Sequence, residues 1–160
     1  MNIEPVPIQF PEGSNIIFGQ SHFIKTVEDL HEVMATSTPT IKFGLAFSEA
    51  SGPCLVRYSG NDAGLAQIAA DNILRLACGH TFLIVMTDAF PIHVLNAVKS
   101  CPEVCRIFCA TGNPITALVV RGPQGGGVIG VIDGSGPKGI ETPADQDKRR
   151  AFLRQIGLKL

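Results

Sequence analysis

The sequence predicts an α/β protein, a single αβα layered domain over residues 1–160 with a mixed sheet. Segments with a helical spacing of apolar residues alternate with short apolar runs of strand length, which indicates helices packed on a sheet. Two pairs of neighbouring strands are close enough in sequence to form hairpins, so the sheet is expected to be mixed. Hydrophobic residues make up 45% of the chain and charged residues 17%, a balance typical of an ordered core.

The first half of the chain supplies a strand, a helix and a hairpin. Residues 14–17 form an apolar strand, and Thr26 is a suitable cap for the helix that follows. Apolar residues repeat on one face of that helix at Val27, Leu30, Val33 and Met34. Residues 41–47 predict a second strand, and residues 55–58 pair back on it. A second helix then extends to Gly79, its expected stop.

The second half begins with residues 81–86, which are too continuously apolar for a half-exposed strand and therefore predict a central one. The next elements are a helix over residues 87–100 and strands over residues 106–110, 117–121 and 128–133. Residues 125–130 match G-x-G-x-x-G, but the dinucleotide motif needs a following helix, and a strand follows here. A final helix, capped by Thr142 and ending at Gly157, is expected to dock on the sheet with its basic face in solvent.

Charge and cysteine usage exclude several classes of protein. Thirteen basic and fourteen acidic residues give a net charge of −1, so bulk electrostatic binding to nucleic acid is not expected. No apolar run is long enough to span a bilayer and the first residues lack a signal peptide, which predicts a cytoplasmic protein with reduced cysteines and no membrane partner. Cys101, Cys105 and Cys109 occur without a paired C-x-x-C, so no metal site is expected. The low charge favours a homo-oligomer.

The most informative stretch is residues 18–26, where a strand leads into a helix. His22 lies on the connecting loop, shortly before the helix, whose first N–H groups are unpaired and bind anions readily. Lys25 adds a mobile positive charge. A neutral imidazole is nucleophilic and titrates near neutrality, so the loop is expected to hold a phosphoryl group with His22 as its acceptor. The alternative is that His22 is an ordinary hydrogen-bonding loop residue.

Other polar groups end the neighbouring strands: Ser48 with Glu49, and then Asp88, Asn113 and Asp133. These loops converge on one ligand if parallel strands gather them at one edge of the sheet. Otherwise they are the turn residues that any strand end needs. His80 precedes the central strand, at the edge opposite most of these loops unless antiparallel strands reverse that order.

Longer stretches of the chain resemble the adenosine-specific kinase family. The matching stretches are residues 19–30, 41–52, 77–82, 88–92, 102–111 and 128–134. They follow one another in order, which makes the resemblance more specific than one short pattern. It implies an αβα layered fold, binding of adenosine or AMP, and a histidine that carries a stable phosphate. His22 and His80 both fall in matching stretches, whereas His93 stands where asparagine is expected; Ser21 replaces an expected threonine and keeps the hydroxyl.

The mechanism predicted from these residues is phosphoryl transfer to the 5′-hydroxyl of adenosine through a phosphohistidine, on His22 by the loop argument or on His80 as the alternative. Lys25 and the helix N–H groups would neutralise the phosphate. Glu49 or Asp88 would take the hydroxyl proton. If ATP is the donor, magnesium is expected to share the charge.

Six further side chains complete the expected substrate-binding set. Asn113 is assigned to the adenine edge and Asp133 to the ribose hydroxyls; the others are Gln20, Ser21, Thr26 and Ser48. Two other functions remain open. A module that senses adenosine or AMP without turnover accounts for the missing Walker loop. A purely structural subunit of an oligomer would bind no nucleotide at all.

Overall fold

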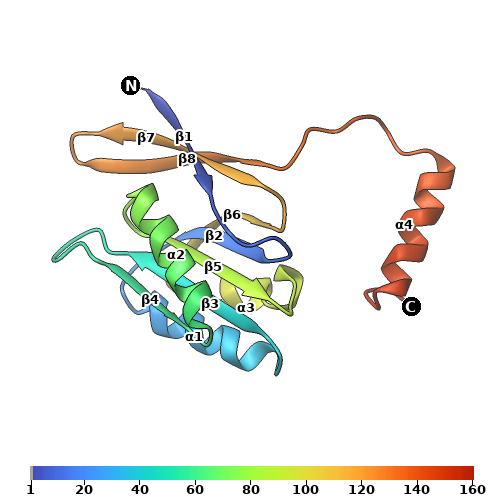
Figure 1. Ribbon diagram of the computed structural model, residues 1–160, viewed down its shortest axis with the longest axis horizontal. Helices are drawn as coiled ribbons and strands as arrows, with labels where there is room; N and C mark the ends of the chain where they lie inside the picture. Colours follow the sequence, from blue (N-terminus) through green and yellow to red (C-terminus); the bar gives the residue numbers. More distant parts are fainter. Residues whose placement is uncertain (1) are drawn as a thin grey trace.

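The computed structural model describes residues 2–160 (Figure 1). In chain order the elements are β1 (Ile3–Ile8), β2 (Asn15–Ser21), α1 (Thr26–Ser37), β3 (Lys42–Ser48), β4 (Val56–Gly60), α2 (Ala63–Leu76), β5 (Thr81–Thr87), the 3-10 turn η1 (Pro91–His93), α3 (Leu95–Lys99), β6 (Val104–Thr111), β7 (Ile115–Gly122), β8 (Gly125–Asp133) and α4 (Pro143–Gln155). The alternation of helices and strands predicted from the sequence is therefore present, and the class is α/β as expected.

Two sheets make up the body of the protein. The larger has five strands in the order β4-β3-β5-β2-β6, and the smaller has three in the order β1-β7-β8. Neighbouring strands in both sheets pair antiparallel. β5 occupies the centre of the larger sheet, as its continuous apolar sequence predicted, and every residue from 81 to 86 is buried.

The larger sheet carries a layer on each face. Helix α1 and the short α3 cover one face, with a core formed by Leu30, Met34, Phe43, Phe82 and Val98. Helix α2 and the smaller sheet share the other face, with a core that includes Val6, Phe18, Ile73, Leu76 and Val119. Helices thus pack on both sides of a sheet, which is the αβα arrangement expected.

Side chains cap two of the helices, and the cap at Thr142 was predicted. The Asp62 carboxylate accepts a 2.9 Å hydrogen bond from Leu65 N and caps α2. At α4, Thr142 and Asp145 form a reciprocal capping box ahead of Pro143. Both signals are local in sequence, and the one at Thr142 acts where it was expected.

Four expectations about helices were wrong. The helix expected over residues 87–100 is instead the turn η1 followed by the short helix α3. Helix α2 ends before Gly79, because Ala77 takes the left-handed conformation (φ 48°) and its N–H closes the last turn on Ile73 O. Thr26 is the first residue of α1 rather than its cap, and its hydroxyl donates to Phe23 O at 2.6 Å. Helix α4 does not dock on its own sheet: none of its side chains is buried, and it projects from the body at the end of an extended segment (Figure 1).

Within residues 2–160, no helix combines the length and the apolar character needed to cross a membrane.

Candidate functional site: a cavity between two histidines

Strand directions decide which predicted residues meet. β2 and β3 both run antiparallel to β5, so the ends of β2 and β3 lie at the same sheet edge as the start of β5. His22 follows β2, Glu49 follows β3, and His80 directly precedes β5. The antiparallel pairing therefore brings His80 to the edge that holds His22, the reversal that the sequence left open.

The two histidines line one cavity of ≈ 360 Å³ at this edge. Its walls are the loop after β2 (His22, Phe23, Ile24), the loop after β3 (Glu49, Ala50, Ser51, Gly52, Pro53), Phe47 and His80. The imidazole ring centroids are 6.3 Å apart and their planes cross at 75°. This volume and spacing suit a small ligand group held between two nitrogen heterocycles.

His80 is held firmly in place. Its N–H donates to Ser48 O at 2.8 Å, and its own carbonyl accepts from Ser21 N at 2.9 Å, so its backbone bridges the ends of β3 and β2. Its ring stacks on Phe47, with centroids 5.7 Å apart and an interplanar angle of 20°. His80 also has a φ of 62°, a conformation that costs energy outside glycine and concentrates at functional sites.

The loop that carries His22 is anchored from below. His22 N donates to Glu103 O at 2.7 Å. Ser21 Oγ lies 2.5 Å from Thr26 Oγ1 and 3.2 Å from Glu103 O, and both hydroxyl residues are buried. Ser21 and Thr26 therefore fix the loop, while the exposed His22 ring faces the cavity. Phe23, the next residue, adopts a φ of 88°.

The Glu49 carboxylate is held by two neighbouring groups. Its carboxylate accepts from Leu55 N at 2.8 Å and pairs with Arg57 at 2.9 Å. The Leu55 N–H, and after it the Arg57 guanidinium, lower the pKa of the Glu49 carboxyl. A carboxylate held ionised in this way accepts protons poorly, but it positions the 50–54 loop and can accept hydrogen bonds from hydroxyl groups.

The positive charge of Lys25 points toward α1. The Lys25 ammonium pairs with Asp29 one turn along the helix. The N–H groups of Thr26 and Val27 donate to Phe23 O and Ile24 O at 3.2 and 3.3 Å. Part of the anion-binding capacity predicted for this helix start is therefore used within the loop itself, because the chain makes a tight turn just before α1.

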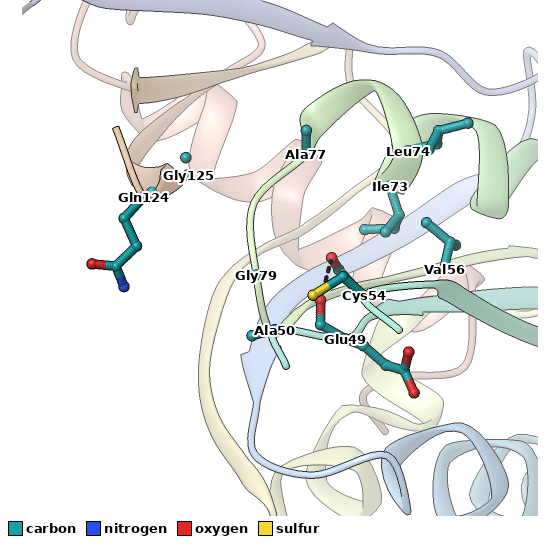
Figure 2. A pocket seen from close by; sticks show the side chains of 13 residues that line it. Glu49, Ala50, Cys54, Val56, Ile73, Leu74, Ala77, Gly79, Gln124 and Gly125 are labelled. Atoms are coloured by element: carbon teal, nitrogen blue, oxygen red, sulfur yellow. Dashed lines mark hydrogen bonds between the residues drawn. The ribbon is translucent and has the colours of Figure 1, made fainter. Parts of the chain in front are cut away.

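A larger cavity of ≈ 640 Å³ adjoins the first one. Glu49 and Ala50 line both cavities. Figure 2 shows the end of α2 (Ile73, Leu74, Ala77), the hairpin residues Cys54 and Val56, and the glycine-rich turn at Gln124 and Gly125 around it. Ser48, expected to bind substrate, lines this second cavity. Together the two cavities offer space for a ligand larger than a phosphate.

Four other expected residues line neither cavity. Asp88 follows the end of β5, at the edge opposite His80. Asn113 lies between β6 and β7, and Asp133 accepts from Thr111 Oγ1 at 2.8 Å and from Asn113 Nδ2 at 3.2 Å. These residues close the turn before β7. Gln20 lies within β2, between Thr81 and Arg106 of the flanking strands.

The sequence argument missed two contributors to the site. Phe47 supplies the surface on which His80 stacks, and Arg57 holds Glu49. The two are direct cross-strand partners in the β3–β4 hairpin. The predicted hairpin could have indicated the Glu49–Arg57 pair, because its register places Arg57 beside the end of β3, where Glu49 follows. No group of three or more His, Cys, Asp or Glu side chains in the described part of the chain is arranged to hold a metal ion.

Comparison with known proteins agrees with this fold. The family model described as "Adenosine specific kinase" matches residues 6–159, and the chain belongs to that family. The crystal structure of the PH1918 protein from Pyrococcus horikoshii OT3 is similar to this chain, with a TM-score of 0.95 and 42% sequence identity; the match covers 99% of this chain and 98% of that one. No curated protein matches the chain.

Proposed function

We propose that this protein transfers a phosphoryl group to adenosine through a phosphohistidine formed in the His22–His80 cavity. The observation that carries the proposal is the position of two imidazoles, 6.3 Å apart, on one cavity of ≈ 360 Å³. Family membership supports adenosine as the nucleoside. His22 is the preferred carrier because it is exposed on a loop, and His80 is the alternative.

The proposed transfer has two steps. A neutral imidazole nitrogen of His22 attacks phosphorus, and the N–P bond forms as the bond from phosphorus to the donor oxygen breaks. The 5′-hydroxyl oxygen of adenosine then attacks the same phosphorus, the N–P bond breaks, and AMP forms. His80, across the cavity, takes the hydroxyl proton in preference to Glu49, whose pKa is lowered by Leu55 N–H and Arg57, and to Asp88, which lies at the other edge.

This site has few groups that could neutralise the charge of a phosphate. Lys25 would have to exchange Asp29 for the phosphate, a small movement for an exposed ammonium. If ATP is the donor, magnesium bound by its phosphates shares the charge. Ser48 and Glu49, on the adjoining cavity, are the proposed ribose-binding residues, whereas Asn113 and Asp133 have no place in this scheme.

Labelling with γ-³²P ATP tests the proposal. The wild-type chain is expected to acquire label that is stable in base and labile in acid, the behaviour of a phosphoramidate. His22→Ala is expected to abolish the label. His31→Ala and His93→Ala remove histidines outside this cavity and serve as matched controls. Absence of label on the wild type, or full label in both His22→Ala and His80→Ala, contradicts the phosphohistidine.

The second candidate is an adenosine- or AMP-sensing module without turnover. It is favoured by the pairing of Lys25 with Asp29, which leaves the described lining of the histidine cavity without a lysine or arginine. Calorimetry with adenosine, AMP and ATP, run beside a turnover assay, separates the two functions. Tight AMP binding without product formation establishes the sensor. The cytoplasmic location and the homo-oligomer both stay predictions.

A further inference from the structure

The C-terminal segment of residues 134–160, here called the arm, leaves the body of the protein. It begins after β8, continues as an extended stretch, and ends in α4, well separated from both sheets in Figure 1. No side chain of α4 is buried, although the helix has an apolar face. Phe152 is 56% exposed and Ile156 is 45% exposed, and Leu153 lies beside them.

The sequence nevertheless specifies this helix strongly. The capping box at Thr142 starts it, and Gly157 ends it with a φ of 75°. The N–H of Leu158 bonds to Leu153 O and that of Gly157 to Arg154 O, the pattern of a Schellman cap. A helix of 13 residues is still marginal in water without tertiary packing, so α4 needs a surface to cover its apolar face.

The position of the arm is shared with a solved relative. The arm is about a sixth of the chain. A TM-score of 0.95 over 99% of the residues requires that nearly all of them superpose, and the arm is too large a share to lie elsewhere. In that crystal structure too, therefore, the arm leaves the body. Two proteins that are 42% identical thus both have a projecting arm. A surface that covers this arm in both proteins must always be present, and a second copy of the chain provides such a surface.

The three-stranded sheet offers a face that fits. Its inner residues, such as Val6, Ala117 and Val119, belong to the core. The alternate positions point outward and carry Ile3, Pro5, Pro7, Thr116, Leu118, Val120 and Ile132. Ile132 is 54% exposed, and Ile129, next to the β8 irregularity, is 58% exposed. Gly127 and Gly130 on β8 have open space above them, which leaves the face shallow enough to seat a helix.

Charge favours contact between an arm and another body. Residues 134–160 carry six basic and three acidic side chains, whereas residues 1–133 carry seven basic and eleven acidic ones. The arm is thus net positive and the body net negative. Opposite net charges promote association of the arm of one chain with the body of another, even though the whole chain is close to neutral.

We propose that α4 of one protomer packs its Phe152–Ile156 face on the outer face of the β1-β7-β8 sheet of a second copy. The exchange covers two apolar surfaces that the single chain leaves open. It also defines the interface of the expected homo-oligomer, and it is independent of the phosphoryl chemistry proposed above.

Light scattering coupled to gel filtration tests both sides of the interface. Phe152→Asp on the arm and Ile132→Asp on the sheet are each expected to convert an oligomer into a species of protomer mass. Ala151→Asp adds the same charge to the opposite side of α4, and Ile92→Asp adds it to an exposed apolar site elsewhere. Both controls are expected to stay oligomeric. A wild-type chain of protomer mass, or dissociation by Phe152→Asp without dissociation by Ile132→Asp, overturns the proposal.

Amide hydrogen exchange on the wild-type chain gives a readout that does not depend on a variant folding correctly. The amides of α4 are expected to be protected at high protein concentration and to lose protection on dilution, while those of β5 stay protected throughout. If dilution lowers the measured mass of the protein but leaves the protection of the α4 amides unchanged, exchange of the arm is contradicted.

Discussion

Ser21 N donates to His80 O at 2.9 Å, and this one hydrogen bond joins the strand end that precedes His22 to the strand start that follows His80. It exists because β2 and β5 are antiparallel neighbours. The relative position of the two imidazoles is therefore set by main-chain pairing in the centre of the sheet.

The stack of His80 on Phe47 gives the first prediction. Phe47→Leu removes the aromatic partner of the imidazole, so the ring should sample more orientations and the rate of phosphoryl transfer should fall more than adenosine affinity. The free energy of unfolding should fall by about 1 kcal/mol, the usual worth of an aromatic pair. Urea unfolding and steady-state kinetics measure the two effects.

Phe43→Leu is the control, because Phe43 is equally buried on β3 but contacts His31 rather than His80. It should cost similar stability and leave transfer unchanged. Equal losses of activity in the two variants would show that the effect comes from the core alone.

The elements of the fold were predictable because their signals are local. Thr142 caps α4 as its position indicated, and residues 81–86 form the central strand because five of these six side chains are apolar. Strand direction is not a local property. It decides that His80 joins His22 and that Asp88 does not, so the membership of the site could be predicted only in part.

Competition between hydrogen bonds explains the remaining differences at the site. Thr26 has a hydroxyl suited to capping, but this hydroxyl bonds to Phe23 O and Ser21 Oγ. Lys25 has a carboxylate one helical turn away and pairs with it. Each side chain bonds to a partner close to it in the sequence. The residue types alone do not show which of several available partners that will be.

Gly44 gives a prediction about the interface between β3 and α2. A Cβ at this position would lie 2.0 Å from Ala66 N and 2.1 Å from Leu65 C, both backbone atoms of α2. Gly44→Ala must push the helix away from the sheet, and the free energy of unfolding should fall by about 3 kcal/mol, as for a severe overpacking. Gly139→Ala, in the arm with nothing within 4 Å, should change it by less than about 0.5 kcal/mol. A fully stable Gly44→Ala protein would show that α2 can move away from β3 at little cost in free energy.

The Glu49–Arg57 pair predicts an effect on binding. Arg57→Leu removes the cation, so the pKa of Glu49 should rise toward its ordinary value and the 50–54 loop should lose one of its two anchors. Adenosine affinity measured by calorimetry should fall about tenfold, because the 50–54 loop is held less firmly. Arg75→Leu, which removes a guanidinium on α2 away from both cavities of the site, should leave affinity unchanged. Unaltered binding in Arg57→Leu would exclude Glu49 from ligand contact.

Glu103 predicts a pH dependence of stability. Glu103 is buried, with 6% of the residue exposed, and within the described chain neither carboxylate oxygen has a hydrogen-bond partner. Burial, and after it the neighbouring Asp29 carboxyl, raise the pKa of Glu103, while Lys25 opposes the change. Because the pKa is higher in the folded chain than in the unfolded chain, the folded state binds the proton more tightly.

The sign of the effect follows from that difference. Below the ordinary pKa of 4.5 both states are protonated and Glu103 costs no stability. As the pH rises through the interval between the unfolded and the folded pKa, the unfolded chain ionises first and stability falls. Above the folded pKa the loss is complete.

Glu103→Gln removes this loss, so the variant should exceed the wild type in free energy of unfolding at pH 7 and should match it near pH 4. Urea unfolding at both pH values measures the difference between the two proteins, which cancels the contributions of other carboxylates such as Glu49. Glu12→Gln, at an exposed site, should show no such difference at either pH. A Glu103→Gln protein that is less stable than the wild type at pH 7 would mean that the ionised carboxylate stabilises the loop that carries His22.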